Sequence, residues 1–216
     1  MRILALADIH NAHQKVENIL AAQENVDLIL LVGDITTNCT EEAATNIIDK
    51  IKKYGKPIFG IAGNMDSLQI NSAMIKMDCS IDGREKHLND VGFFGVSGGP
   101  YSMLHTPFEI SEDEILQKAE NGWLLVKDFR WKIFVPHAPP FQTKLDKPFL
   151  GKHVGSTAVR QFIERHQPDA VLCGHIHESR GTDILGRTKM MNCGSTAQGY
   201  YGIVTIGNDI TLENCG

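Results

Sequence analysis

Short, almost uninterrupted runs of Ile, Leu and Val alternate with amphipathic stretches through the first half of the chain. The apolar runs occupy residues 2–8, 27–34 and 57–64, and the amphipathic stretches between them occupy residues 12–24 and 40–55. A strand that is apolar on both faces must be covered on both sides, as happens when parallel strands are joined by crossover helices. The pattern therefore predicts a sheet with helices packed against it.

The second half of the chain combines further buried strands with turn-rich segments. Residues 130–140 and 168–175 are predicted strands, and residues 156–167 between them are a predicted helix. Turn signals from Thr182 onward divide the C-terminal part into hairpin strands that continue to residue 214. Two packed sheets within one domain account for this mixture of crossovers and hairpins.

Two more segments have a distinct local pattern. A helix is predicted over residues 111–121, because Ser111 is followed three residues later by Glu114, which is the spacing of a capping box. Residues 139–155 are rich in Pro, Gly and Lys and are predicted to form a long loop. Loops of that length in a compact domain usually have a functional role.

The length and hydropathy of the chain limit its organisation and its location. It has 216 residues, of which 42% are hydrophobic and 22% charged, which fits one ordinary domain over residues 1–216. No apolar run is long enough to span a bilayer, and the first predicted strand leads into Asp8 and His10 without a cleavage site. We therefore expect a cytoplasmic protein with no membrane partner.

Cysteine usage and net charge disfavour several other classes. The five cysteines are widely spaced and form no Cys-x-x-Cys pair, so neither a disulfide framework nor a zinc ribbon is indicated. We expect most of them to be buried thiols, with Cys215 the most exposed. The formal net charge of -5 argues against broad electrostatic binding to a nucleic-acid backbone, and we do not expect nucleic acid as the main partner. These cysteines are Cys39, Cys79, Cys173, Cys193 and Cys215.

Polar residues interrupt the apolar runs where each predicted strand ends. In open α/β sheets the carboxyl ends of the strands meet in one crevice, so such residues come together from distant parts of the chain. Each of them has a plainer explanation when taken alone, as a turn residue, a helix cap or a buried core histidine. The seven residues are Asp8, His10, Asp34, Asn64, His137, His175 and His177.

Taken together, these seven residues predict a metal site. Three carboxyl or carboxamide groups and four imidazoles at one end of a sheet leave a large desolvation cost unless cations compensate it. Mixed nitrogen and oxygen donors suit Mn, Fe, Zn, Ni or Co better than Ca or Mg, and the lack of cysteine ligands disfavours a structural zinc site.

The motifs at these positions resemble the calcineurin-like metallophosphoesterase superfamily. The resemblance rests on "ADIH", "VGD", "GNMD", "VPHAPP" and "CGHIH", which occur in the order of the superfamily and extend over almost the whole chain. The chain looks most like the small archaeal and bacterial phosphoesterases of that superfamily. The resemblance implies a four-layer αββα sandwich of two mixed sheets flanked by helices, with a dinuclear metal site at the carboxyl ends of the strands.

The same resemblance implies the ligand set and the reaction. Asp8, His10 and His177 would hold one metal ion, and Asn64, His137 and His175 the other. Asp34 would bridge the two ions, of which manganese is the favoured identity. Asp34, Asn64 and His137 would then position phosphate and a metal-bridging hydroxide that hydrolyses a small phosphate ester. Resemblance to small family members favours a phosphodiester over a monoester.

Met65 departs from the pattern of the superfamily. In many members a histidine supported by the following acidic residue acts near the leaving group at this position, whereas a thioether cannot donate a proton. We therefore expect a preference for leaving groups that need no protonation. His105 and His153 are candidate replacements, although each is more simply explained as a loop histidine that faces water.

Two other functions fit the same residues. Some relatives use this fold as a scaffold for protein assembly with little catalysis, but the seven competent donors favour an enzyme here. A nuclease would need a basic or aromatic platform, and the loop residues Lys144, Lys147 and Lys152 offer only a small basic rim. The sequence carries no signal for an oligomeric state.

Overall fold

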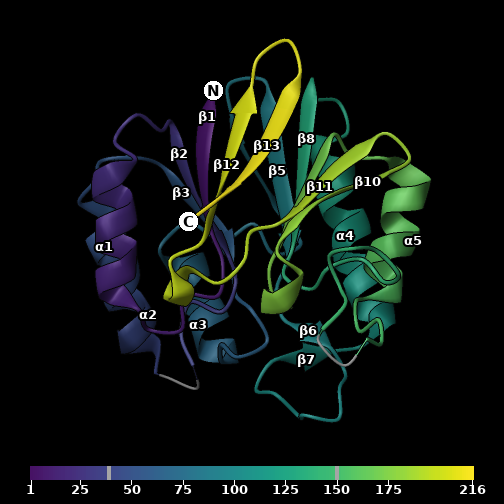
Figure 1. The fold of residues 1–216 in the computed structure, drawn as a ribbon, viewed down its shortest axis with the longest axis horizontal. Helices are drawn as coiled ribbons and strands as arrows, with labels where there is room; N and C mark the ends of the chain where they lie inside the picture. Colours follow the sequence, from purple (N-terminus) through teal and green to yellow (C-terminus); the bar gives the residue numbers. More distant parts are fainter. Residues whose placement is uncertain (38–39, 149–150) are drawn as a thin grey trace.

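The computed structural model describes residues 1–37, 40–148 and 151–216, and it has a layered α/β architecture (Figure 1). Two mixed sheets pack face to face in the middle, and helices cover the outer face of each sheet. This arrangement confirms the predicted four-layer sandwich. Cys39 lies outside the described residues, as do residues 149 and 150 of the predicted long loop.

The first sheet has five strands in the described part of the chain, in the order β13-β12-β1-β2-β3. Strands β1, β2 and β3 are parallel, while β12 and β13 form an antiparallel hairpin at the other edge. The strands are β1 Arg2–Leu6, β2 Leu28–Val32, β3 Ile58–Ile61, β12 Tyr201–Ile206 and β13 Ile210–Cys215.

The second sheet has six strands among the described residues, in the order β10-β11-β9-β8-β5-β4. Strands β11, β9, β8 and β5 are parallel to one another, and an antiparallel strand lies at each edge. The strands are β4 Glu85–Leu88, β5 Val91–Val96, β8 Trp131–Pro136, β9 Ala170–Cys173, β10 Gly181–Leu185 and β11 Thr188–Asn192. A short parallel pair, β6 Gly99–Pro100 and β7 Glu109–Ile110, lies at the end of the sandwich opposite the N-terminus (Figure 1).

The helices lie in two groups, one on each side of the sandwich (Figure 1). Helices α1 His13–Ala22, α2 Glu41–Lys52 and α3 Leu68–Lys76 cover the first sheet, and α4 Glu112–Val126 and α5 Thr157–His166 cover the second. At the start of α4 the Ser111 hydroxyl accepts a hydrogen bond from the Glu114 amide at 3.1 Å, which confirms the predicted cap.

Alternation along the strands creates the two cores of the molecule. In β1, Ile3 and Ala5 face the interior between the sheets, while Leu4 and Leu6 face the helices, and all four are fully buried. Successive side chains of a strand point to opposite faces, so a strand covered on both sides needs apolar residues at every position. This requirement explains the continuous apolar runs of the sequence.

Several sequence predictions differ from the observed elements. Helix α3 was not predicted, and α4 continues to Val126 beyond its predicted end at residue 121.

The described residues of the 139–155 segment contain no helix or strand, in agreement with the predicted loop. Three of the four described cysteines are buried, and Cys215 is partly exposed, as expected. In the part of the chain that the structure describes, every helix is too short or too polar to cross a bilayer.

Candidate metal centre

The seven predicted ligands converge at one end of the sandwich. They follow the carboxyl ends of strands β1, β2 and β3 in the first sheet and β8 and β9 in the second. Because these strands are parallel within each sheet, their ends point to the same edge. The donors therefore come from both sheets and meet where the sheets face each other.

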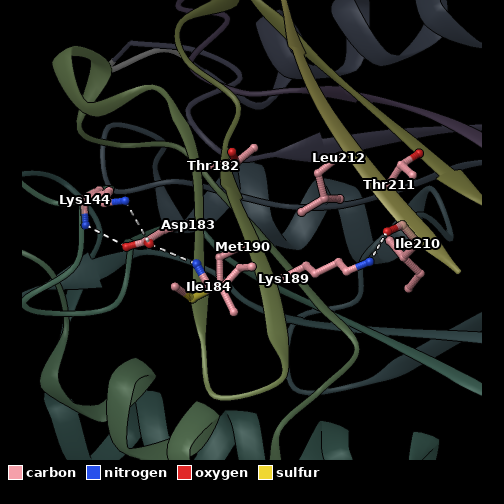
Figure 2. A pocket seen from close by; sticks show the side chains of 9 residues that line it. All are labelled: Lys144, Thr182, Asp183, Ile184, Lys189, Met190, Ile210, Thr211 and Leu212. Carbon is pink, nitrogen blue, oxygen red and sulfur yellow. Dashed lines mark hydrogen bonds and ion pairs between the residues drawn. The ribbon is translucent and has the colours of Figure 1, made fainter.

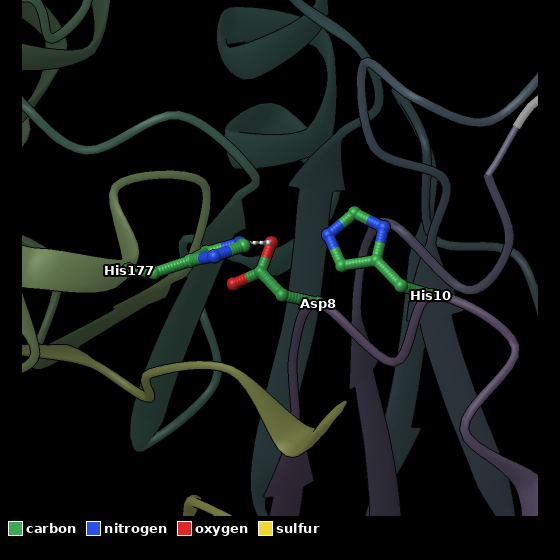
Figure 3. A group of neighbouring side chains, drawn as sticks. All are labelled: Asp8, His10 and His177. Carbon is green, nitrogen blue, oxygen red and sulfur yellow. Dashed lines mark ion pairs between the residues drawn. The ribbon is translucent and has the colours of Figure 1, made fainter. Parts of the chain in front are cut away.

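Asp8 joins His10 and His177 in the first group of donors (Figure 3). One ligand atom from each residue lies within 4.8 Å of the others, and His177 Nε2 is 3.4 Å from Asp8 Oδ1. The imidazole rings of His10 and His177 are arranged edge to face, with centroids 5.4 Å apart. Both rings lie beside the Asp8 carboxylate (Figure 3). The three residues are spaced to share one cation.

Asn64 lies between two other imidazoles. Its Oδ1 atom is 3.0 Å from His137 Nε2 and 2.7 Å from His175 Nδ1. The structure thus brings together the three residues that the resemblance assigns to the second metal ion. Which residue holds which ion stays a prediction, because Asp8, Asp34 and His137 are also spaced to hold a cation.

Asp34 reaches both groups of donors. Its Oδ1 atom is 3.4 Å from His137 Nε2, and its Oδ2 atom is 3.8 Å from His10 Nε2. The amide of Met65 donates a hydrogen bond to Oδ1 at 2.8 Å. The Asp34 carboxylate thus lies between two imidazoles, and its bridging role stays a prediction.

The environment of His137 fits a bound cation. Its Nδ1 atom is 2.8 Å from the carbonyl oxygen of Val32, which can only accept, so Nδ1 carries a proton. Its Nε2 atom then faces three acceptor oxygens, those of Asn64 at 3.0 Å, Asp34 at 3.4 Å and Asp8 at 4.0 Å. A lone pair directed at three oxygens in a fully buried site is unfavourable unless a proton or a metal ion lies between them.

The pKa values in the centre follow from the same charges. Burial alone would lower the pKa of His137, but the charge and hydrogen bond of Asp34, together with Asp8, raise it to about 9. Burial and the neighbouring His137 lower the pKa of His175 to about 4, so its imidazole is neutral at neutral pH. A hydrogen bond to Asp8 raises the pKa of His177. When no metal ion is bound, protonation of His137 supplies positive charge next to the carboxylates of Asp34 and Asp8.

The backbone is strained at four of the predicted ligands. Asp8, His10, Asp34 and His175 have positive φ angles of 52°, 45°, 50° and 69°. Residues other than glycine rarely adopt this region, and such strain is concentrated at functional sites where the surrounding structure maintains it. The loops here are held in conformations that present donors rather than in relaxed turns.

Two glycines permit the close approach of the donor loops. A Cβ atom on Gly33 would overlap Nδ1 of His137, and Gly33 itself has a φ of 91°. A Cβ atom on Gly63 would overlap Oδ1 of Asp34. Any side chain at these positions must displace a predicted ligand, which accounts for the glycine that precedes Asp34 and Asn64.

Asp66 supports the site, although no sequence pattern predicts it there. Its buried carboxylate accepts hydrogen bonds from the amides of Ile35, Thr36 and Gly63 at 2.8–3.0 Å, and from the Thr36 hydroxyl at 2.9 Å. It thereby ties the loop that carries Asp34 to the loop that carries Asn64. Burial and the nearby charge of Asp34 raise the pKa of Asp66 to about 6.

Asn192 supports the loop on the other sheet. Its side-chain amide donates to the carbonyl oxygens of Gly174 and Ile176 at 3.2 and 2.9 Å, on either side of His175. The only sequence signal for this role is a polar residue at the end of the predicted strand before Cys193. Such a residue is indistinguishable from a turn residue without the fold.

The histidines proposed to act on the leaving group lie elsewhere. His105 is exposed on the loop between β6 and β7, and His153 Nδ1 is 2.6 Å from the buried carboxylate of Asp146. Neither lines the cavity beside the donors, whereas the side chain of Met65 does. Their proposed role stays a prediction that this placement does not support.

The cavity beside the donors has a volume of about 750 Å³ and is lined by five of the predicted ligands. A second cavity of about 530 Å³ lies between the β10-β11 hairpin and β13 (Figure 2). There the Asp183 carboxylate accepts a hydrogen bond from the Lys144 amide at 3.0 Å, and Lys189 Nζ donates to the carbonyl of Ile210 at 2.7 Å. Its charged groups are thus satisfied within the protein, and we place the chemistry in the first cavity.

Comparison with known proteins agrees with this geometry. The family model described as calcineurin-like phosphoesterase matches residues 1–179. A relative from Methanocaldococcus jannaschii, described as an uncharacterized protein, is 28% identical over 220 residues, which cover 99% of this chain and 96% of the relative.

Solved structures share the fold at low sequence identity. The crystal structure of a Thermus thermophilus protein is 18% identical with a TM-score of 0.79, and the match covers 100% of this chain and 98% of that one. A dimetal phosphatase from Danio rerio is 12% identical with a TM-score of 0.67, over 100% of this chain and 96% of that one.

Proposed function

Because the chain belongs to the calcineurin-like phosphoesterase family, we propose that it is a dinuclear-metal-dependent hydrolase of small phosphodiesters. The observation that carries this proposal is the buried Nε2 atom of His137, which faces three oxygen acceptors and therefore needs a proton or a metal cation between them. Several charged groups buried together are costly without such compensation.

We propose the donor sets that the resemblance implies. Asp8, His10 and His177 would hold one cation, Asn64, His137 and His175 would hold the other, and Asp34 would bridge them. Two divalent cations, when bound, supply positive charge to phosphate oxygens and lower the pKa of a water molecule. Manganese is the favoured ion, with nickel, cobalt, iron and zinc as alternatives for this donor set.

The chain itself positions the phosphate group. The Oδ1 atom of Asn64 faces the imidazoles of His137 and His175, so the amide nitrogen of Asn64 is the donor that we assign to a phosphate oxygen. The Met65 amide fixes the carboxylate of Asp34. The β6-β7 loop lines one side of the cavity.

The charges around the cavity favour a diester over a monoester. A diester carries one negative charge and a monoester dianion carries two, and beyond the metal cations the described residues that line the cavity include no Lys or Arg to attract the extra charge. Met65 offers no proton to a leaving group. We therefore assign preference to phosphodiesters whose leaving groups are stable as anions.

A metal-dependent turnover assay tests this function. Purified protein is freed of metal, and turnover of a bis-aryl phosphodiester and an aryl phosphomonoester is measured with Mn, Ni, Co, Zn and Mg added in turn. We expect metal-stimulated turnover that is faster on the diester and is lost in Asp34→Asn. Turnover no higher than that of Asp34→Asn with every metal would remove the enzyme proposal and favour the scaffold.

A nuclease is the less favoured alternative. The three lysines of its predicted basic rim do not line the cavity beside the donors, and Lys144 lines the second cavity instead. Addition of single-stranded DNA and RNA to the same metal series distinguishes the two activities, since only a nuclease would cleave them faster than the small diester.

A further inference from the structure

One wall of the cavity beside the donors is apolar and open to solvent. Tyr101, Met103 and Leu104 of the β6-β7 loop line it, with exposures of 72%, 96% and 82%. Val154 and Ile176 line it from the side of the second sheet. Large apolar side chains that stand exposed together beside a site commonly mark the place where an apolar ligand packs.

This wall is anchored by the fold. Glu109 Oε1 accepts hydrogen bonds from the Ser102 hydroxyl at 2.7 Å and from the amide and hydroxyl of Thr106 at 3.0 and 2.9 Å. At the base of the loop the amide of Phe108 donates to the carbonyl oxygen of Asn64 at 3.0 Å. The loop is thereby attached to a predicted metal ligand, and the apolar side chains have a defined position relative to the donors.

The charges of the wall exclude a second anionic group. No Lys or Arg occurs among the described residues that line the cavity, and a charged residue, Glu109 of β7, lies at the base of the loop. Burial alone would raise the pKa of Glu109, but hydrogen bonds from Ser102 and Thr106 lower it to about 2, so its carboxylate is anionic at neutral pH. A substituent that carries further phosphates would be repelled here, whereas a neutral one would not.

We propose that the substrate is a phosphodiester with an uncharged apolar substituent, which packs against Tyr101, Met103 and Leu104. The inference rests on the proposed function, because it places the phosphate group at the donors. The substituent lies on the β6-β7 loop and spans toward Val154 and Ile176. This contact makes the loop the specificity-determining element of the site.

Binding of symmetrical dialkyl phosphates to the manganese-loaded protein tests the proposal. Each of these monoanions carries the same alkyl chain on both sides of the phosphate, so one chain reaches the wall in either orientation. Their alkoxide leaving groups make them slow to hydrolyse. Dissociation constants of diethyl, dibutyl and dihexyl phosphate are measured by calorimetry. Because the wall is open, it should bury only about half of each added methylene group. We therefore expect roughly 2-fold tighter binding for each added methylene.

The double variant Met103→Ser with Leu104→Ser should reduce this gain to less than half. Both side chains are exposed, so the change should leave the fold intact, which a thermal melt verifies. The matched control is Leu124→Ser with Leu125→Ser on α4, which alters two leucines that are 60% and 54% exposed and lie outside the cavity. The control should keep the full dependence on chain length.

The outcomes separate this inference from the proposed function. If the protein turns over the bis-aryl diester but binds diethyl and dihexyl phosphate equally, the apolar wall does not hold the substrate and the inference is wrong. The same conclusion follows if the loop variant keeps the full gain with chain length. If neither turnover nor binding of any ester depends on metal, the proposed function itself fails.

Discussion

Asp34 is held from several directions, and one of its contacts comes from the backbone of residue 65. The Met65 amide donates to Asp34 Oδ1 at 2.8 Å, while the Met65 side chain lines the cavity. The backbone of Met65 thus holds Asp34, and its side chain faces the cavity. A change of the side chain alone should leave the position of Asp34 unaltered and report on the chemistry in the cavity.

Met65→His should therefore broaden the range of leaving groups. An imidazole in this position supplies the missing proton donor, and general acid catalysis contributes about 100-fold to 10,000-fold where the leaving group needs a proton. We expect kcat on an alkyl diester to rise by at least about 30-fold and kcat on an aryl diester by less than about 3-fold. Leu124→His, on the exposed face of α4 and outside the cavity, is the control. Equal gains on both esters would show that the thioether does not limit the substrate range.

Asp66→Asn should destabilise the protein although it removes a buried charge. The carboxylate accepts bonds from three amides and a hydroxyl, whereas an asparagine offers one acceptor oxygen and places an NH₂ group against donors. Buried donors left unpaired cost about 1–3 kcal/mol each, partly offset by the relief of the charge. We expect a loss of about 2 kcal/mol in the free energy of unfolding at pH 7, measured in urea.

Asp78→Asn is the matched control for that measurement. Asp78 forms an ion pair with Lys86 at 2.8 Å, but its side chain is 92% exposed. Exposed ion pairs contribute little to stability, because solvent screens the two charges. If the two variants lose equal stability, the hydrogen bonds to Asp66 do not hold the two loops together.

Sequence patterns predict which side chains gather at the site but not the residues that hold them in place. Asp8 and His137 could be predicted because each interrupts an apolar run at the end of a strand. Asp66 and Asn192 could not, because their partners are backbone groups brought near only by the fold. A hydrogen bond to a distant amide leaves no spacing in the sequence, unlike a strand or a helix.

At the scale of elements, the donor loops are short and tightly packed against one another. The loop after β2 and the loop after β3 approach so closely that Gly63 has no room for a Cβ atom beside Asp34. The same sheet that aligns the strands therefore sets the spacing of the donors. A side chain placed between the loops must push one of them away.

Gly63→Ala should weaken metal binding strongly. The added methyl group overlaps Asp34 Oδ1, and the contact is relieved only if the carboxylate moves out of line with His137. Loss of one well-placed ligand contact of about 1.4–3 kcal/mol corresponds to roughly 10-fold to 100-fold weaker binding of manganese, measured by calorimetry. Gly207→Ala is the control, since nothing lies within 4 Å of a Cβ atom there. Unchanged affinity in Gly63→Ala would mean that Asp34 does not bind the metal.

Helix α3 is the described α-helix that the sequence pattern does not predict. Helix α3 buries only Ile70, Ala73 and Met74 over nine residues, and its N-cap makes no side-chain hydrogen bond. In α4, Gly122 interrupts the expected pattern, but the structure uses it for close packing against Phe94, and the helix continues. Tertiary packing here overrides the weak helix propensity of glycine.

At the scale of the whole molecule, the donor set joins the two sheets. Asp8, His10, Asp34 and Asn64 follow strands of the first sheet, and His137, His175 and His177 follow strands of the second. A cation bound between them ties elements that are far apart in sequence, and it stabilises the folded state by mass action. The metal should therefore affect the stability of the entire fold.

The pH dependence of stability should be weaker with metal than without it. In the metal-free protein the pKa of His137 is raised from 6.5 to about 9, so its stabilising effect is complete below pH 6.5 and is lost as pH rises through 9. A metal ion that takes the Nε2 lone pair must displace this proton, and the raised pKa of His177 adds a second competing proton. Metal binding is therefore favoured as pH rises.

Thermal melts at pH 6, 7 and 8 with manganese and with chelator test this contrast. In chelator the melting temperature should fall from pH 7 to pH 8, above the pH at which histidines of the unfolded chain lose their protons, while the increment due to manganese should grow by about 1.4 kcal/mol per pH unit for each proton displaced. His137→Gln removes one titrating group and should reduce the growth of the increment with pH. His166→Gln is the control, because His166 pairs with Glu120 on the outer helices at 2.9 Å and should leave the increment unchanged. An increment that is equal at pH 6 and pH 8 would mean that the imidazole of His137 does not exchange its proton for a metal ion.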